Sequence, residues 1–119
     1  MECASALSEL VGDCLLAHGC PNGTAERAAL FTEEIGLTVL EHNRQAKKPL
    51  LIELSLFFEA DRVLIIERDS GILFDLTDPD AQIKGLSGFI LSGLMEAHDE
   101  KAYLVTTGYN RNMIRFSRK

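Results

Sequence analysis

The stretch LLIELSLFFEADRVLIIERD, residues 50–69, decides the fold class of this 119-residue chain. Two apolar runs flank Glu59, Ala60 and Asp61, and this pattern predicts a β-hairpin. In the first run, apolar and polar residues alternate, as they do in a strand with one buried face. The second run has four consecutive apolar residues at 63–66, which indicates a more fully buried strand. We therefore expect an antiparallel sheet in this half of the chain.

The residues before the hairpin are expected to form two helices. The first lies within residues 1–20 and ends at HGCPNG, because its apolar side chains recur at three- and four-residue spacing up to that point. The second, the Glu-bearing helix 24–43, is predicted to begin with Thr24 as its N-cap and Glu26 in its first turn. The positions expected to face the core are Leu7, Leu10, Val11, Cys14 and Leu15 in the first helix and Ala28, Phe31, Ile35 and Val39 in the second.

The rest of the chain is expected to complete the sheet. In order, it holds a polar, lid-like loop at 76–85, a short helix at 88–97 that Ser87 can cap, and a hairpin whose strands, 101–107 and 112–117, are joined by Gly108, Tyr109 and Asn110. Helices that segregate from a mostly antiparallel sheet predict an α+β fold, a two-layer sandwich with helices on one face. The length suits a single domain, 1–119, in which residues 49–119 supply the sheet, lid loop and short helix.

Composition and charge narrow the function classes. Hydrophobic residues make up 46% and charged residues 25% of the chain, which is ordinary for a soluble globular domain. The formal net charge of -6 argues against a nucleic-acid binder, because no basic stripe is available to release phosphate counterions. No segment approaches the ~20 apolar residues that cross a bilayer. The N-terminus lacks the basic region of a signal peptide, so we expect a cytoplasmic protein without membrane contact.

The cysteines do not form a recognisable framework. Cys3, Cys14 and Cys20 are an odd number, which predicts a reducing compartment. Cys14, His18 and Cys20 match no zinc spacing and have no fourth ligand nearby. Cys14 is therefore interpreted as a small hydrophobic residue of the core.

Three places carry residues suited to chemistry. Glu34, Thr38 and His42 are spaced by four, so they share one stripe of the second helix. Such a stripe is either a solvated face or a group of functional side chains. Asp69 and Gly71 follow a buried strand, where Ser70-Gly71 is either a plain turn or the end of a binding strand.

The second place, Asp69 and Gly71, has side-chain and backbone chemistry suited to binding a base. A carboxylate at Asp69 can accept a hydrogen bond from the six-amino group of adenine, whereas the six-oxo group of guanine offers it no donor. Gly71 would let the backbone approach a flat ring closely. The third place is KGLSGF, where Lys84, Gly85 and Gly88 at a helix start form either a phosphate cradle or an ordinary loop entering a helix.

The order of these features resembles the GHKL ATPase family, which includes histidine kinases and gyrase, and it is most similar to the anti-sigma-factor serine kinases. The similarity extends from about residue 26 to the C-terminus. On the helix, the family motif of Glu, Asn and His at four-residue steps appears as Glu34, Thr38 and His42. The first glycine motif, Asp-x-Gly-x-Gly, keeps Asp69 and Gly71. The resemblance implies ATP binding with Mg²⁺, in which Asp69 holds adenine and Glu34 orients or activates the attacking hydroxyl. The other nucleotide-contacting positions it implies are Thr38, His42, Gly71, Lys84, Gly85 and Gly88.

Several positions depart from the family pattern. Thr38 replaces the Asn that ligates Mg²⁺, so its neutral hydroxyl would reach the ion only through water or a shifted helix. Leu73 replaces the second glycine, Gly85 and Gly88 have a different spacing, and Ser87 narrows the phosphate end. The usual first strand is missing or lies before residue 1. These departures imply that adenine recognition is better preserved than turnover.

Three functional hypotheses follow. The first is an ATP/ADP-binding domain in bacterial regulation, including a protein serine/threonine kinase that acts on a regulatory partner. The second is a nucleotide-free interaction module, whose partner is a sigma factor, an antagonist, or a second copy bound through the first helix. The third, compatible with both, is a cytoplasmic regulatory domain of a larger protein.

Overall fold

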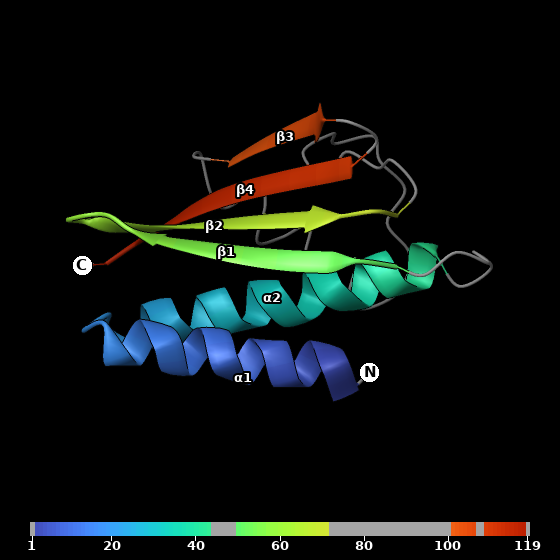
Figure 1. Cartoon of the computed structure of the whole chain (residues 1–119). Coiled ribbons are helices and arrows are strands. Elements are labelled where there is room, and N and C mark those ends of the chain that lie inside the picture. Colours follow the sequence, from blue (N-terminus) through green and yellow to red (C-terminus); the bar gives the residue numbers. More distant parts are fainter. Residues whose placement is uncertain (1, 44–49, 72–100, 107–108, 119) are drawn as a thin grey trace.

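The structure, a computed structural model, describes residues 2–43, 50–71, 101–106 and 109–118. Its elements are α1 (Glu2–Ala17), α2 (Asn22–His42), β1 (Ile52–Phe58), β2 (Arg62–Asp69), β3 (Lys101–Thr106) and β4 (Tyr109–Ser117). The strands form an antiparallel sheet in the order β1-β2-β4-β3. Both helices lie on the same face of this sheet (Figure 1). The predicted α+β class and its antiparallel sheet are confirmed.

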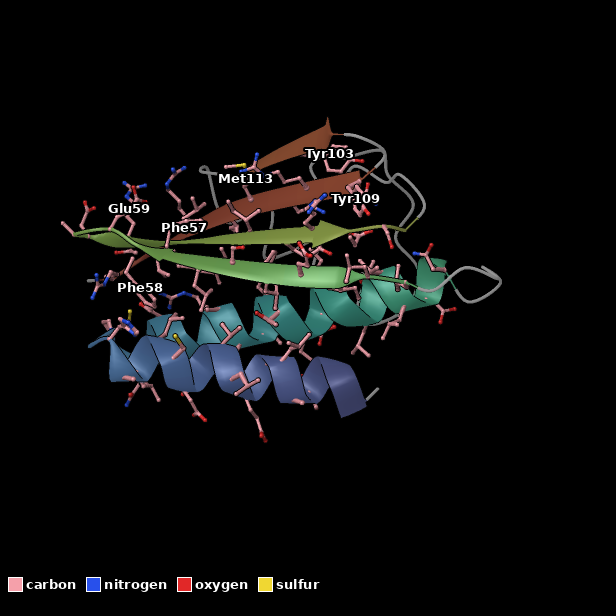
Figure 2. The ribbon with its side chains drawn as sticks, viewed as in Figure 1. Phe57, Phe58, Glu59, Tyr103, Tyr109 and Met113 are labelled. Carbon is pink, nitrogen blue, oxygen red and sulfur yellow. The ribbon has the colours of Figure 1, made fainter. Side chains whose placement is uncertain are left out.

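The predicted β1–β2 hairpin is present. The backbone N–H of Glu59 donates to the carbonyl of Arg62 at 2.8 Å and closes the turn. The alternating residues of β1 separate two environments, since Figure 2 shows Phe58 on the helix side and Phe57 on the opposite side. Phe58 packs against the core, whereas Phe57 is 51% exposed. The period-two pattern therefore identified the inner face of the strand correctly.

The core lies between the helices and the inner face of the sheet. The predicted buried positions of α2 are all buried, and Phe31 meets Phe116 of β4 edge to face, with ring centroids 6.1 Å apart. In α1, Val11 and Leu15 are buried. Leu10 is wrong as a core position because it is 65% exposed, lying about 100° around the helix from Val11. Cys14 is only half-buried and does not belong to the core cluster.

The start of α2 differs from its prediction. The helix begins at Asn22, with Pro21 in the N-cap position and no side-chain cap. Thr24 lies inside the first turn, and its hydroxyl donates to the carbonyl of Ser117 at 2.6 Å. The predicted N-cap was wrong because this hydroxyl has a distant acceptor, which ties the start of α2 to the end of β4. Among the described residues, neither helix has the length and apolar character to cross a bilayer.

The closing hairpin also differs in its turn. Tyr109 and Asn110, predicted as turn residues, are the first two residues of β4 and pair with Thr106 and Val105. Asn110 lies in the strand because it also pairs with Asp69 across the sheet. The predicted lid loop and the short helix at 88–97 lie outside the described residues.

Candidate functional site

The inner face of the two central strands changes from apolar to polar along its length. Register places Ile65 of β2 opposite Ile114 of β4, and the next inward-facing pairs are Glu67 with Asn112 and Asp69 with Asn110. These four polar residues, called here the polar block, are each at most 3% exposed. Four buried polar side chains on neighbouring strands are costly unless they are paired or bind something.

Asp69 is held in a fixed orientation within the polar block. Its Oδ1 accepts hydrogen bonds from the N–H of Gly71 at 3.0 Å and from Asn110 Nδ2 at 2.9 Å. The hydroxyl of Tyr103 donates to Asn110 Oδ1 and orients that amide in turn. Figure 2 shows Tyr103 and Tyr109 at this end of the sheet. Asp69 Oδ2 is buried, and apart from the neighbouring carboxyl group of Glu67 it has no hydrogen-bond donor among the described residues, so that carboxyl group or a ligand must supply one.

Glu67 forms the deeper layer of the polar block. Asn112 Nδ2 donates to Glu67 Oε1 at 3.1 Å, whereas Glu67 Oε2 and Asn112 Oδ1 have no partner among the described residues. The pKa of Glu67 is raised to about 9, first by burial and then by a hydrogen bond with Asp69 and the charge of Asp69, against a lowering by the hydrogen bond from Asn112. Glu67 is therefore neutral near physiological pH and carries an O–H donor.

Glu34 and Thr38 lie on the flank of α2 away from α1. The hydroxyl of Ser8 in α1 donates to the Ala29 carbonyl at 2.9 Å, which places α1 on the flank that carries Ala29. Helical geometry puts Glu34 and Thr38 on the opposite flank. They are 7% and 4% exposed, and Glu34 Oε2 and Thr38 Oγ1 have no partner in the described part of the chain. The interpretation of this stripe as a solvated face is therefore wrong for Glu34 and Thr38.

Two contacts fix α2 along the sheet. Phe31 meets Phe116 near one end of β4, and Asn43, just after α2, lies against Gly71. Glu34 and Thr38 lie between these contacts, toward the end of the sheet that holds the polar block. A Cβ at position 71 would lie 2.5 Å from Asn43 Nδ2, so a larger residue here would require the Asn43 side chain to move. Approach of a flat ring to Gly71 stays a prediction.

The remaining predicted site residues are placed less completely. His42 is the last residue of α2. Lys84, Gly85 and Gly88 lie outside the described residues. Of the three cysteine-region residues considered for metal, Cys14 Sγ lies 3.8 Å from His18 Nδ1 and Cys20 is buried in the core. Residues 2–43, 50–71, 101–106 and 109–118 contain no group of three or more His, Cys, Asp or Glu that could hold a metal.

Comparison of the sequence with family models and with curated proteins finds no match. What the site can bind must therefore be inferred from its own atoms. Five buried oxygen atoms lack a partner among the described residues: Glu34 Oε2, Thr38 Oγ1, Glu67 Oε2, Asp69 Oδ2 and Asn112 Oδ1. An unsatisfied buried polar group costs about 1–3 kcal/mol. A ligand that donates hydrogen bonds to this group of oxygens, or coordinates them, would offset that cost.

Sequence reasoning identified Asp69, Glu34 and Thr38 but missed Glu67, Asn110 and Asn112. A partial signal exists for Glu67, since it lies two residues before Asp69 on a strand and must share its face. The two asparagines are recognised only through the pairing of β4 with β2, which brings residues 45 and 41 positions apart into contact.

Proposed function

We propose that the protein binds an adenine nucleotide between α2 and the polar block, as a GHKL-type ATPase domain does. The observation that carries this proposal is the state of Asp69, whose Oδ1 accepts two hydrogen bonds while its buried Oδ2 has no donor among the described residues apart from the adjacent Glu67 carboxyl group. A fixed, charged acceptor is suited to the exocyclic amino group of adenine. It opposes guanine, which has an acceptor at the same ring position.

Glu34 and Thr38 are assigned to the phosphate end of this nucleotide. The open Oε2 of Glu34 supports a role in orienting or activating the hydroxyl that attacks a terminal phosphate. The open hydroxyl of Thr38 fits an oxygen ligand of Mg²⁺, directly or through water. Bound Mg²⁺ would neutralise phosphate charge. With these roles the domain is a protein serine/threonine kinase, and its substrate is a regulatory partner such as a sigma factor or its antagonist.

Calorimetric titration of the full chain with ATP, ADP and GTP, each with and without Mg²⁺, tests nucleotide binding. We expect ATP and ADP to bind and GTP to bind at least about 10-fold more weakly, because a donor is replaced by an acceptor opposite Asp69. Absence of heat with all three nucleotides, together with no thermal shift at millimolar concentration, would contradict the proposal.

A nucleotide-free interaction module is the second candidate function. Thr38 favours it, because a short neutral hydroxyl stands where the resembled family has an amide ligand for Mg²⁺. Its partners would be a sigma factor, an antagonist or a second copy of the chain. The same titration separates the two candidates, since only the first requires nucleotide.

The Thr38 hydroxyl itself gives a stability prediction. Thr38→Val keeps the side-chain shape and removes a buried hydroxyl without a described partner, so we expect the unliganded protein to become about 1 kcal/mol more stable. Thr32→Val on the same helix is the control, because the buried Thr32 hydroxyl donates to the Ala28 carbonyl at 2.9 Å. Urea denaturation measures both. A loss of stability in Thr38→Val as large as that in Thr32→Val would show that the Thr38 hydroxyl is already paired.

A further inference from the structure

Glu67 and Asp69 form a pair of neighbouring acids with different surroundings. They are two residues apart on β2, so their side chains leave the same face of the sheet. Glu67 is 0% and Asp69 is 1% exposed, and each has one oxygen without a described partner. Glu67 belongs to the polar block, but the nucleotide-binding proposal assigns it no contact with the ligand.

The groups that face Glu67 leave it without a cation. Across the strands it has Leu54 on β1 and Asn112 on β4, the charged residue next to it on the same face of β2 is Asp69, and the buried charged residue of α2, the helix that covers this face, is the acid Glu34. Arg68 alternates to the opposite face, where it pairs with Glu53 at 3.3 Å. Within the described residues, a proton is therefore the one positive charge available to Glu67, in agreement with its raised pKa.

The hydrogen bond from Asn112 fixes where this proton lies. Asn112 Nδ2 donates to Glu67 Oε1, so Oε1 is the acceptor oxygen and Oε2 carries the proton. The pair then presents a donor at Glu67 Oε2 beside an acceptor at Asp69 Oδ2. In the free protein the Glu67 O–H can donate to Asp69 Oδ2. A ligand that offers an acceptor to Glu67 beside a donor to Asp69 can replace that contact.

We propose that Glu67 is a specificity residue of the nucleotide site, whose carboxyl O–H donates to the ring nitrogen N1 of adenine while Asp69 accepts from the neighbouring amino group. Adenine offers an acceptor at N1 beside a donor at its amino group. Guanine offers the reverse, N1–H beside an oxygen. Its N1–H would face the Glu67 O–H donor, and its oxygen would face the Asp69 acceptor. The inference rests on the proposed adenine site and adds its second base contact.

Binding of ADP and of 1-deaza-ADP, in which a C–H replaces N1, tests this contact on the unaltered protein. We expect 1-deaza-ADP to bind about 10- to 100-fold more weakly, because it leaves a buried donor unpaired. Glu67→Gln should keep the preference for ADP, since its amide N–H replaces the carboxyl O–H. Glu67→Leu should bind both ligands with equal, weakened affinity. ADP affinity should also fall in the wild type, but not in Glu67→Gln, as pH rises through about 9.

The outcomes separate this inference from the function on which it rests. If ADP binds and 1-deaza-ADP binds equally well, Glu67 does not read N1 and the nucleotide site stands without it. If Glu67→Gln folds and loses the preference, the donor role is likewise wrong. If ADP does not bind the wild-type protein at all, the proposed function is overturned and this inference with it.

Discussion

Replacing Asp69 with asparagine is expected to weaken ATP binding by at least about 100-fold while preserving the fold. Both hydrogen bonds to the side chain, from the Gly71 N–H and Asn110 Nδ2, arrive at Oδ1. The amide oxygen of asparagine can keep both, which places its NH₂ where Oδ2 was. The ligand amino group would then meet a donor instead of a charged acceptor. Calorimetry with ATP measures the change.

Asp61→Asn is the matched control for this substitution. Asp61 is exposed in the β1–β2 turn, so the same chemical change there should leave ATP affinity unaltered. Circular dichroism and urea denaturation verify that both variants are folded. Equal ATP affinity in Asp69→Asn and the wild type would show that Asp69 does not contact the base. An increase in GTP binding by Asp69→Asn would support the assignment further, because its NH₂ can donate to the guanine oxygen.

Replacing Glu67 with glutamine is expected to stabilise the protein by about 3 kcal/mol near pH 7. The folded state holds the pKa of Glu67 at about 9, whereas its ordinary value is 4.5. Below pH 4.5 Glu67 is protonated in both the folded and the unfolded chain, so its ionisation does not change the free energy of unfolding. As pH rises from about 4.5 to about 9, the unfolded chain ionises first and stability is lost progressively. Glutamine cannot ionise and so escapes this loss.

The pH dependence is the decisive part of this stability prediction. Urea denaturation across the pH range should show a difference between wild type and Glu67→Gln that is small near pH 4.5 and grows toward pH 9. Glu53→Gln serves as the control, because Glu53 forms an exposed ion pair with Arg68 that is worth at most about 1 kcal/mol. A stabilisation of Glu67→Gln that did not vary with pH would mean that Glu67 is ionised in the folded protein.

Features set by local periodicity were predictable from the sequence. The alternation in residues 52–58 gave the inner face of β1, and the spacing of Phe31, Ile35 and Val39 gave the buried face of α2, because both periods follow from backbone geometry alone. Asp69 was a candidate because it ends a buried strand, and this too can be recognised from neighbouring residues alone. Whether the domain is of the GHKL type stays a prediction.

Features set by distant contacts were not predictable. Thr24 looked like an N-cap, but its hydroxyl has the Ser117 carbonyl as a partner 93 positions away. Glu34 was compatible with a solvated helix face, and only the tertiary packing around α2 shows that it is buried. The pairing of Glu67 with Asn112 depends on the register of β2 against β4, and no local pattern encodes that register.

The place of β4 in the chain has a consequence for the newly made protein. β4 lies in the interior of the sheet beside β2, yet it follows every other described strand in the sequence. A nascent chain that has not released residues 109–117 from the ribosome has no Asn110 or Asn112 with which to pair the acids of β2. Until then Glu67 and Asp69 remain on an open strand edge, which is a hazard for aggregation. The nucleotide proposed for this site would therefore find Glu67 and Asp69 paired with their asparagines only after β4 has docked, too late to guide the earlier steps of folding.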